Sequence, residues 1–92
     1  MGMLEDDLDE GVRGQATKLA TCDDILEEVR KELYRATRKH GAMKSTHEGY
    51  AVILEELDEL WHEVKHGTEA KARKEAIQVA AMAVRFIADL LD

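Results

Sequence analysis

The sequence predicts an all-α fold with a helical hairpin at its core and an additional N-terminal helix. The 92-residue chain has no proline and few aromatic residues, and the residues that dominate it favour helices. Apolar residues recur at steps of three and four, and no alternation typical of strands appears. A chain this short buries only part of its apolar surface. We therefore expect oligomerisation to complete a four-helix-type bundle.

The N-terminal part is weakly patterned, so we divide the chain into a segment at 1–20 and one helical domain at 21–92. Three apolar residues of the first segment fit a short helical turn: Met3, Leu4 and Leu8. Gly11 and Gly14 follow and are expected to interrupt it. The segment is expected to be flexible or to form a short helix.

The first strong helical pattern covers about 22–40. Its apolar residues have helical spacing: Ile25, Leu26, Val29, Leu33 and Ala36. Thr21 or Asp23 suits the N-cap. Basic residues at 38–40 suit the C-terminal end, and Gly41 fits the position just past the helix.

The second helix is expected from about Thr46 to His66, with Gly67 ending it. Ser45 followed by Glu48 is typical of a capping box. Its apolar residues form one stripe: Tyr50, Ile53, Leu54, Leu57, Leu60, Trp61 and Val64.

The last helix begins at Thr68 and is expected to lie antiparallel to the second, because the connection is short. Its expected buried face has eight members: Ala76, Ile77, Ala80, Ala81, Val84, Ile87, Ala88 and Leu91. The many alanines predict a close helix approach. Met43 and Met82 are expected to be packing residues.

Composition excludes several classes of function. The chain has 20 acidic and 13 basic residues, a net charge of −7, which makes it a poor binder of nucleic-acid backbones. Cys22 is the sole cysteine, which suits a reducing compartment, and we expect it to be a structural thiol near a helix start. The acidic N-terminus is unlike a signal peptide, and no apolar run approaches the roughly 20 residues of a membrane span. We expect a cytoplasmic protein with no nucleic-acid polymer and no membrane as a partner.

An acidic cluster at 55–59 is the most informative feature. Glu56 and Glu59 are one turn apart and flank the apolar stripe. On the next helix Glu75 and Gln78 have the same spacing. Glu59 lies eight residues before Gly67 and Glu75 eight after it, whereas Glu56 and Gln78 are eleven residues from it.

An antiparallel pairing therefore puts the two pairs at matching heights. Three carboxylates and an amide oxygen would repel one another unless a hard cation bound them, so Mg²⁺ or Mn²⁺ is expected there. The alternative interpretation is a solvated acidic face or ion pairs along the helix. The residues by themselves leave these two readings equally open.

At this point the sequence resembles the MazG-like all-α nucleoside triphosphate pyrophosphohydrolases, in particular small phage and prokaryotic members. That family has an EExxE motif on one helix and ExxD on the next. Residues 55–59 (Glu-Glu-Leu-Asp-Glu) match the first, and residues 75–78 (Glu-Ala-Ile-Gln) match the second except at the last position. The resemblance covers roughly 38–91.

The resemblance implies metal-dependent hydrolysis of a nucleoside triphosphate to monophosphate and pyrophosphate, in the manner of a house-cleaning enzyme for noncanonical or deoxy nucleotides. It implies that Glu56, Glu59 and Glu75 are Mg²⁺ ligands, with Gln78 in the place of an aspartate. Glu55, Glu56 and Glu59 are the implied catalytic acids, and Glu55 is expected to orient a ligand or a water. It also implies a homodimer or homotetramer. Gln78 removes a negative charge, so we expect weaker metal affinity.

Three further residues are candidates for binding substrate: Arg85, Lys44 and His47. Arg85 shares a helical face with Glu75 and Gln78, and it suits a phosphate contact or an ion pair equally well. Lys44 lies near the basic cluster at 38–40, for which helix-end charge is the favoured interpretation. His47 could contact substrate, but the favoured interpretation is a polar residue at the start of a helix.

The alternative function is a non-enzymatic helical interaction module or a catalytically impaired relative, and Gln78 keeps it open. An enzyme should be stabilised by Mg²⁺ with a nucleotide, whereas a scaffold should be indifferent to both.

Overall fold

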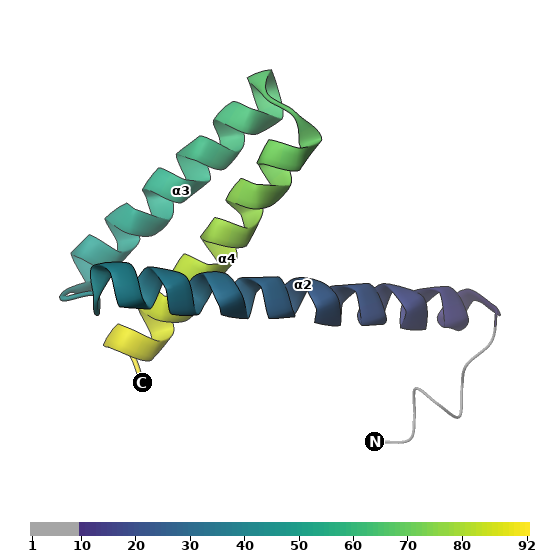
Figure 1. Cartoon of the computed structure of the whole chain (residues 1–92), viewed down its shortest axis with the longest axis horizontal. Helices are drawn as coiled ribbons and strands as arrows, with labels where there is room; N and C mark the ends of the chain where they lie inside the picture. Colours follow the sequence, from purple (N-terminus) through teal and green to yellow (C-terminus); the bar gives the residue numbers. More distant parts are fainter. Residues whose placement is uncertain (1–9) are drawn as a thin grey trace.

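The computed structural model describes residues 10–92, with side chains from residue 18 onward. This part of the chain contains three helices and no strand: α2 (Glu10–His40), α3 (Thr46–His66) and α4 (Glu69–Leu90). α3 and α4 form an antiparallel hairpin, and α2 crosses beside α4 (Figure 1). The all-α prediction is confirmed. The turn expected at Met3, Leu4 and Leu8 lies outside the described residues.

α2 is longer than the sequence predicted. It begins at Glu10 and continues through Gly11 and Gly14, so these glycines do not interrupt it. A glycine weakens a helix by about 1 kcal/mol relative to alanine, which is a cost that neighbouring helix formers can offset. The C-terminal end is as predicted, because Gly41 has a φ of 72° and its amide donates to Thr37 O at 2.9 Å.

The early start of α2 changes the setting of the residues expected at a helix start. Thr21 and Asp23 lie inside the helix and do not cap it. Cys22 is exposed on the same helix, so the expectation of a thiol near a helix start is wrong.

The N-termini of α3 and α4 are capped as the sequence predicted. Ser45 Oγ accepts a hydrogen bond from the amide of Glu48 at 3.1 Å. The Glu48 carboxylate accepts from the Lys44 amide at 3.2 Å, one residue before the partner that a capping box uses. Thr68 Oγ1 accepts from the Lys71 amide at 3.2 Å, which fixes the start of α4 beside α3.

α3 and α4 approach closely at Gly49, which is buried. A Cβ atom there would lie 2.5 Å from Phe86 Cδ2 and 3.0 Å from Leu90 Cδ1. A side chain at this position would therefore push the two helices apart. Because Gly49 has no side chain, the first turn of α3 can pack directly against the last turns of α4.

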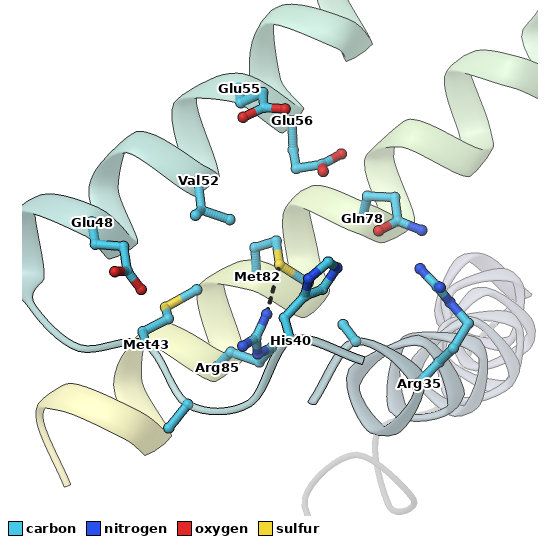
Figure 2. A pocket seen from close by; sticks show the side chains of 12 residues that line it. Arg35, His40, Met43, Glu48, Val52, Glu55, Glu56, Gln78, Met82 and Arg85 are labelled. Atoms are coloured by element: carbon cyan, nitrogen blue, oxygen red, sulfur yellow. Dashed lines mark hydrogen bonds between the residues drawn. The ribbon is translucent and has the colours of Figure 1, made fainter. Parts of the chain in front are cut away.

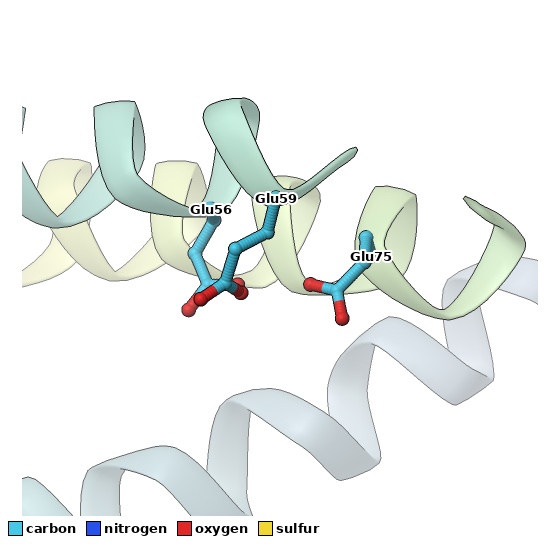
Figure 3. A group of neighbouring side chains, drawn as sticks. All are labelled: Glu56, Glu59 and Glu75. Atoms are coloured by element: carbon cyan, nitrogen blue, oxygen red, sulfur yellow. The ribbon is translucent and has the colours of Figure 1, made fainter. Parts of the chain in front are cut away.

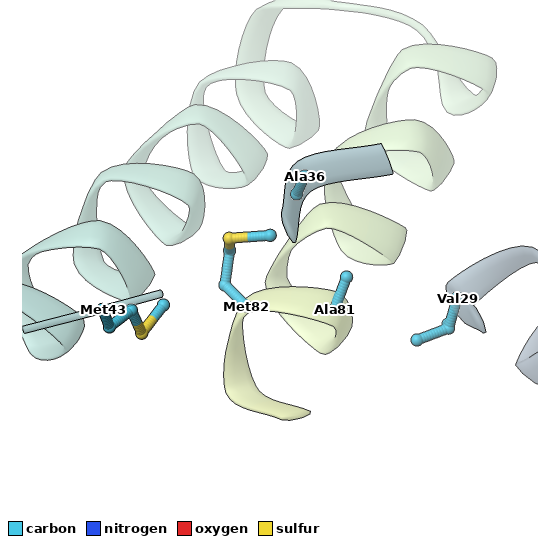
Figure 4. Close-up of a cluster of buried hydrophobic side chains, with 5 residues drawn as sticks. All are labelled: Val29, Ala36, Met43, Ala81 and Met82. Atoms are coloured by element: carbon cyan, nitrogen blue, oxygen red, sulfur yellow. The ribbon is translucent and has the colours of Figure 1, made fainter. Parts of the chain in front are cut away.

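The buried apolar residues lie mainly where α2 meets α4 (Figure 4). They are Val29, Ala36, Met43, Ala81 and Met82. The packing roles predicted for Met43 and Met82 are confirmed. Ala81 is fully buried, and its small side chain suits the close passage of α2.

Eight large apolar residues of α3 and α4 are exposed in the single chain, and we call them the apolar back face. They are Tyr50, Leu54, Leu57, Trp61, Val64, Val84, Ile87 and Leu91. Their spacing puts each set on one side of its helix, turned away from the glutamates at 56, 59 and 75. Val84, Ile87 and Leu91 were predicted on the buried face of the last helix but are exposed in the single chain, because α2 packs on another side of α4. In residues 10–92, the backbones of α2 and α3 do not approach each other.

Candidate functional site

Three glutamates meet between α3 and α4 (Figure 3). Glu56, Glu59 and Glu75 each offer a carboxylate oxygen, and these oxygens lie within 4.8 Å of one another. We call these residues the glutamate triad. The antiparallel hairpin thus brings together the carboxylates that the sequence placed at matching heights.

Burial and mutual repulsion disfavour the charged forms in the triad. The pKa of Glu56 is raised to about 7, chiefly by burial and then by the charges of Glu59 and Glu75. The pKa of Glu75 is also raised, chiefly by burial and then by its contact with Glu59. Near neutral pH the triad therefore retains a proton that a cation could replace.

The donor set suits a hard divalent cation. Each member of the triad supplies carboxylate oxygen, which is the ligand type that Mg²⁺ and Mn²⁺ prefer. Glu75 Oε2 is buried and has no hydrogen-bond partner among the residues that the structure describes. An orphaned buried oxygen of this kind is costly unless another group or ion contacts it.

A pocket of about 340 Å³ adjoins the triad and shares Glu56 with it (Figure 2). α2, the 41–45 connection, α3 and α4 all contribute to its walls. Its charged and polar residues are Arg35, His40, Glu48, Glu55, Glu56, Gln78 and Arg85. Its apolar residues are Ala36, Ala42, Met43, Val52 and Met82.

A second pocket of about 360 Å³ lies between α2 and α4 and shares Arg35 and Gln78 with the first. Four of its residues are cationic: Lys31, Arg35, Arg73 and Lys74. Arg73 is committed to Glu28, to which its Nη1 donates at 2.8 Å. Arg35 is likewise paired with Glu32, to which its Nε donates at 2.9 Å. Lys31 and Lys74 add positive charge to this pocket, and the charge of Lys74 reaches Glu75 of the triad, so this end of the site can attract phosphates.

Arg85 is buried, with only 4 % of its surface exposed. Its Nη2 donates to Gly41 O, and its Nη1 lies 3.5 Å from Met82 Sδ. The nearest carboxylate is Asp89, whose Oδ2 is 4.0 Å from Nη2 and accepts from the Met43 amide at 2.9 Å. The buried position rules out the surface ion pair that the sequence allowed.

The other candidates from the sequence are placed less centrally. Glu55 is exposed and lines the first pocket, and Gln78 lines both pockets. Lys44 and His47 are exposed, and neither lines the pocket beside the triad.

Arg35 is a site residue that the sequence analysis did not single out. Its Nε donates to Glu32 Oε1 at 2.9 Å, and this bond is the main cause that lowers the pKa of Glu32. The charge of Glu56 contributes to raising the pKa of Arg35, so the guanidinium interacts electrostatically with this member of the triad. The spacing of Glu32 and Arg35 predicts a helical ion pair, but only the crossing of α2 over α4 brings that pair to Gln78.

No family model, curated protein or solved structure matches this chain. None of the helices within residues 10–92 combines the length and the apolar character needed to cross a membrane.

Proposed function

We propose that this chain is a metal-dependent nucleoside triphosphate pyrophosphohydrolase of the MazG-like kind. The observation that carries the proposal is the meeting of three carboxylates beside two pockets, one with apolar and charged walls and one rich in cations. The resemblance of residues 55–59 and 75–78 to the family motifs supports it. The reaction would yield a nucleoside monophosphate and pyrophosphate.

Glu56, Glu59 and Glu75 would hold Mg²⁺ or Mn²⁺. The bound ion would offset their repulsion and polarise the phosphates of the substrate. Gln78 would add an amide oxygen, which is a weaker ligand than the carboxylate of the family motif. The pKa values of Glu56 and Glu75 are raised chiefly by burial and then by neighbouring carboxylates, and a bound cation would favour the charged forms of both groups.

The remaining roles fall to residues on α2, α3 and α4. Arg35, Lys31 and Lys74 would bind the phosphates and offset the charge that develops on them. Glu55 would orient the attacking water and accept its proton. The water oxygen would bond to phosphorus while the bond between the α- and β-phosphates breaks, and pyrophosphate would leave.

The test is pyrophosphate release from a panel of ribo- and deoxynucleoside triphosphates with Mg²⁺ or Mn²⁺. We expect the wild type to release pyrophosphate, Glu59→Ala to lose most of the activity and Gln78→Asp to gain activity. Asp58→Ala is the matched control, because Asp58 is exposed beside the triad but is not part of it. A folded wild type that is inactive with every nucleotide and both metals would refute the proposal.

We further propose that a second copy of the chain covers the apolar back face, to give a homodimer or a homotetramer. The eight residues expose an apolar area on the order of 700 Å². This is larger than the largest single apolar patch of a typical monomer and close to the area that one partner buries in a standard interface. The radius of gyration is 16.4 Å, compared with about 12 Å for a compact chain of this length. Both values support an assembly of two or more copies.

Analytical ultracentrifugation tests the assembly. Trp61→Glu should reduce the mass of the particle, whereas His62→Glu, on the exposed neighbour outside the stripe, should leave it unchanged. A wild type that sediments as a monomer at high concentration would contradict the assembly.

The apolar back face also favours the second candidate function, a non-enzymatic interaction module. Thermal unfolding separates the two candidates. Mg²⁺ with a nucleotide should raise the melting temperature of an enzyme and leave that of a module unchanged.

A further inference from the structure

The guanidinium of Arg85 is a buried charge that the proposed reaction does not use. Arginine offers five N–H groups, and within residues 10–92 only two of those of Arg85 have partners, one of them a weak sulfur acceptor. Its Nε is closed to water and has no partner in this part of the chain. The side chain lines the pocket beside the triad, where a ligand would meet it.

The nearby acceptors do not satisfy this charge. Asp89 is 4.0 Å away, beyond hydrogen-bond distance, and its oxygen already accepts from the Met43 amide. Gly41 O and Asp89 explain how α4 anchors the 41–45 connection, but they leave the guanidinium with spare donors. A buried donor without a partner is costly, and a ligand that brings an acceptor would relieve that cost.

Arg85 lies far from the phosphate end of the site. It is ten residues beyond Glu75 on α4, which separates the two by about 15 Å along the helix axis. Lys31 and Lys74 line the second pocket, and Arg35 lines both pockets. With phosphates bound at the triad, Arg85 would meet the opposite end of a nucleotide.

The pocket around Arg85 has the chemistry of a base site. Met43, Met82 and Val52 supply flat or deformable apolar walls, and the pocket volume of about 340 Å³ admits a purine. In Figure 2, Met82 and Met43 lie beside Arg85 at one end, and Glu55 and Glu56 lie at the other. This arrangement separates a base end from a phosphate end.

We propose, on the basis of the proposed function, that this pocket takes the nucleobase and that Arg85 donates to an exocyclic carbonyl oxygen of that base. Guanine and hypoxanthine present two adjacent acceptors, O6 and N7, which match the fork of a guanidinium. Adenine has an amino group in place of O6, so an N–H donor of the base would face an N–H donor of the guanidinium. The substrate class is therefore a nucleoside triphosphate with an oxo-base.

Inosine triphosphate and adenosine triphosphate are the matched probes, because they differ only in the group at position 6 of the base and the proton that accompanies it. We expect kcat/KM to be at least tenfold higher for inosine triphosphate, as is typical when a charged donor is left without its acceptor. Equal values for the two would overturn the inference and leave the proposed function intact. If Arg85 instead contacts a phosphate, both substrates will depend on it equally.

A binding measurement without hydrolysis separates the two proposals. Calorimetry with inosine and adenosine monophosphates in EDTA needs neither metal nor catalysis. Tighter binding of the inosine nucleotide in a protein that hydrolyses no triphosphate would refute the reaction and retain the base site. Equal binding, or none, would refute the base site.

Arg85 also supports the fold through Gly41, so its replacement can unfold the protein. Ala42→Trp avoids that problem, because Ala42 is exposed on the connection and lines the pocket. We expect this variant to weaken binding of inosine monophosphate at least tenfold. Ala51→Trp is the control, since Ala51 is exposed on α3 and does not line the pocket, and it should bind as the wild type does.

Discussion

Replacement of Glu56 by glutamine should stabilise the metal-free protein at pH 8. A pKa raised from 4.5 to about 7 corresponds to roughly 3.5 kcal/mol against the charged form. Because Glu56 is only partly buried, solvent screening lowers this to about 1.5 kcal/mol. Glutamine keeps the shape of the side chain and removes the charge, so the variant should recover that amount.

The pH dependence follows from the direction of the pKa change. An acid whose pKa is raised on folding favours the folded state fully below its unfolded pKa, and this contribution is lost as pH rises through the folded value. The wild type should therefore lose stability between about pH 4.5 and pH 7 through this residue. Glu56→Gln lacks that loss, so the two proteins should differ at pH 8 and much less at pH 5.

Urea unfolding followed by circular dichroism in EDTA, at a fixed protein concentration, measures the difference. Glu55→Gln is the matched control, because the neighbouring carboxylate is exposed and lies outside the triad. Added Mg²⁺ should reverse the order of stability of the wild type and Glu56→Gln, since Glu56→Gln lacks one of the three triad carboxylates. An equal gain for both variants, or no gain for Glu56→Gln at pH 8, would refute the electrostatic argument.

Three other substitutions test separate parts of the structure. Gly49→Ala should lower the free energy of unfolding by about 1–3 kcal/mol in urea, because the new Cβ meets the Phe86 ring; an unchanged value would show that the helices separate without cost. Ser45→Ala should cost about 1 kcal/mol in the same assay through loss of the cap on the Glu48 amide, and no loss would mean that water replaces the hydroxyl. Gln78→Asp should bind Mg²⁺ more tightly by calorimetry, and unchanged affinity would place Gln78 outside the metal shell.

Local signals made the ends of α3 and α4 predictable from sequence. A hydroxyl cap begins each helix, and Gly67 ends α3 with its amide donating to Glu63 O at 2.9 Å. Counting outward from Gly67 was sufficient to predict which glutamates meet, because a short turn fixes the register of an antiparallel pair.

The start of α2 and the buried faces could not be predicted in the same way. Gly11 and Gly14 are weak helix formers, but propensity alone does not end a helix whose other residues favour it. Apolar spacing shows which face of a helix is apolar, but it does not show which element packs against that face. The sequence therefore predicted two apolar stripes without showing which of their residues lie against α2. Arg35 was not predicted as a site residue, because its role depends on the crossing of α2 over α4.

The contact of α2 with α4 but not with α3 has a consequence for the order of folding. The hairpin joins partners close in sequence, so its loop closes at low entropic cost and the triad assembles on a local unit. α2 must then dock onto α4, and it brings the cations Arg35 and Lys31 with it. Amide hydrogens of the hairpin should exchange more slowly than those at the start of α2, which would make the glutamate triad the more rigid part of the site and the cations of α2 its later addition.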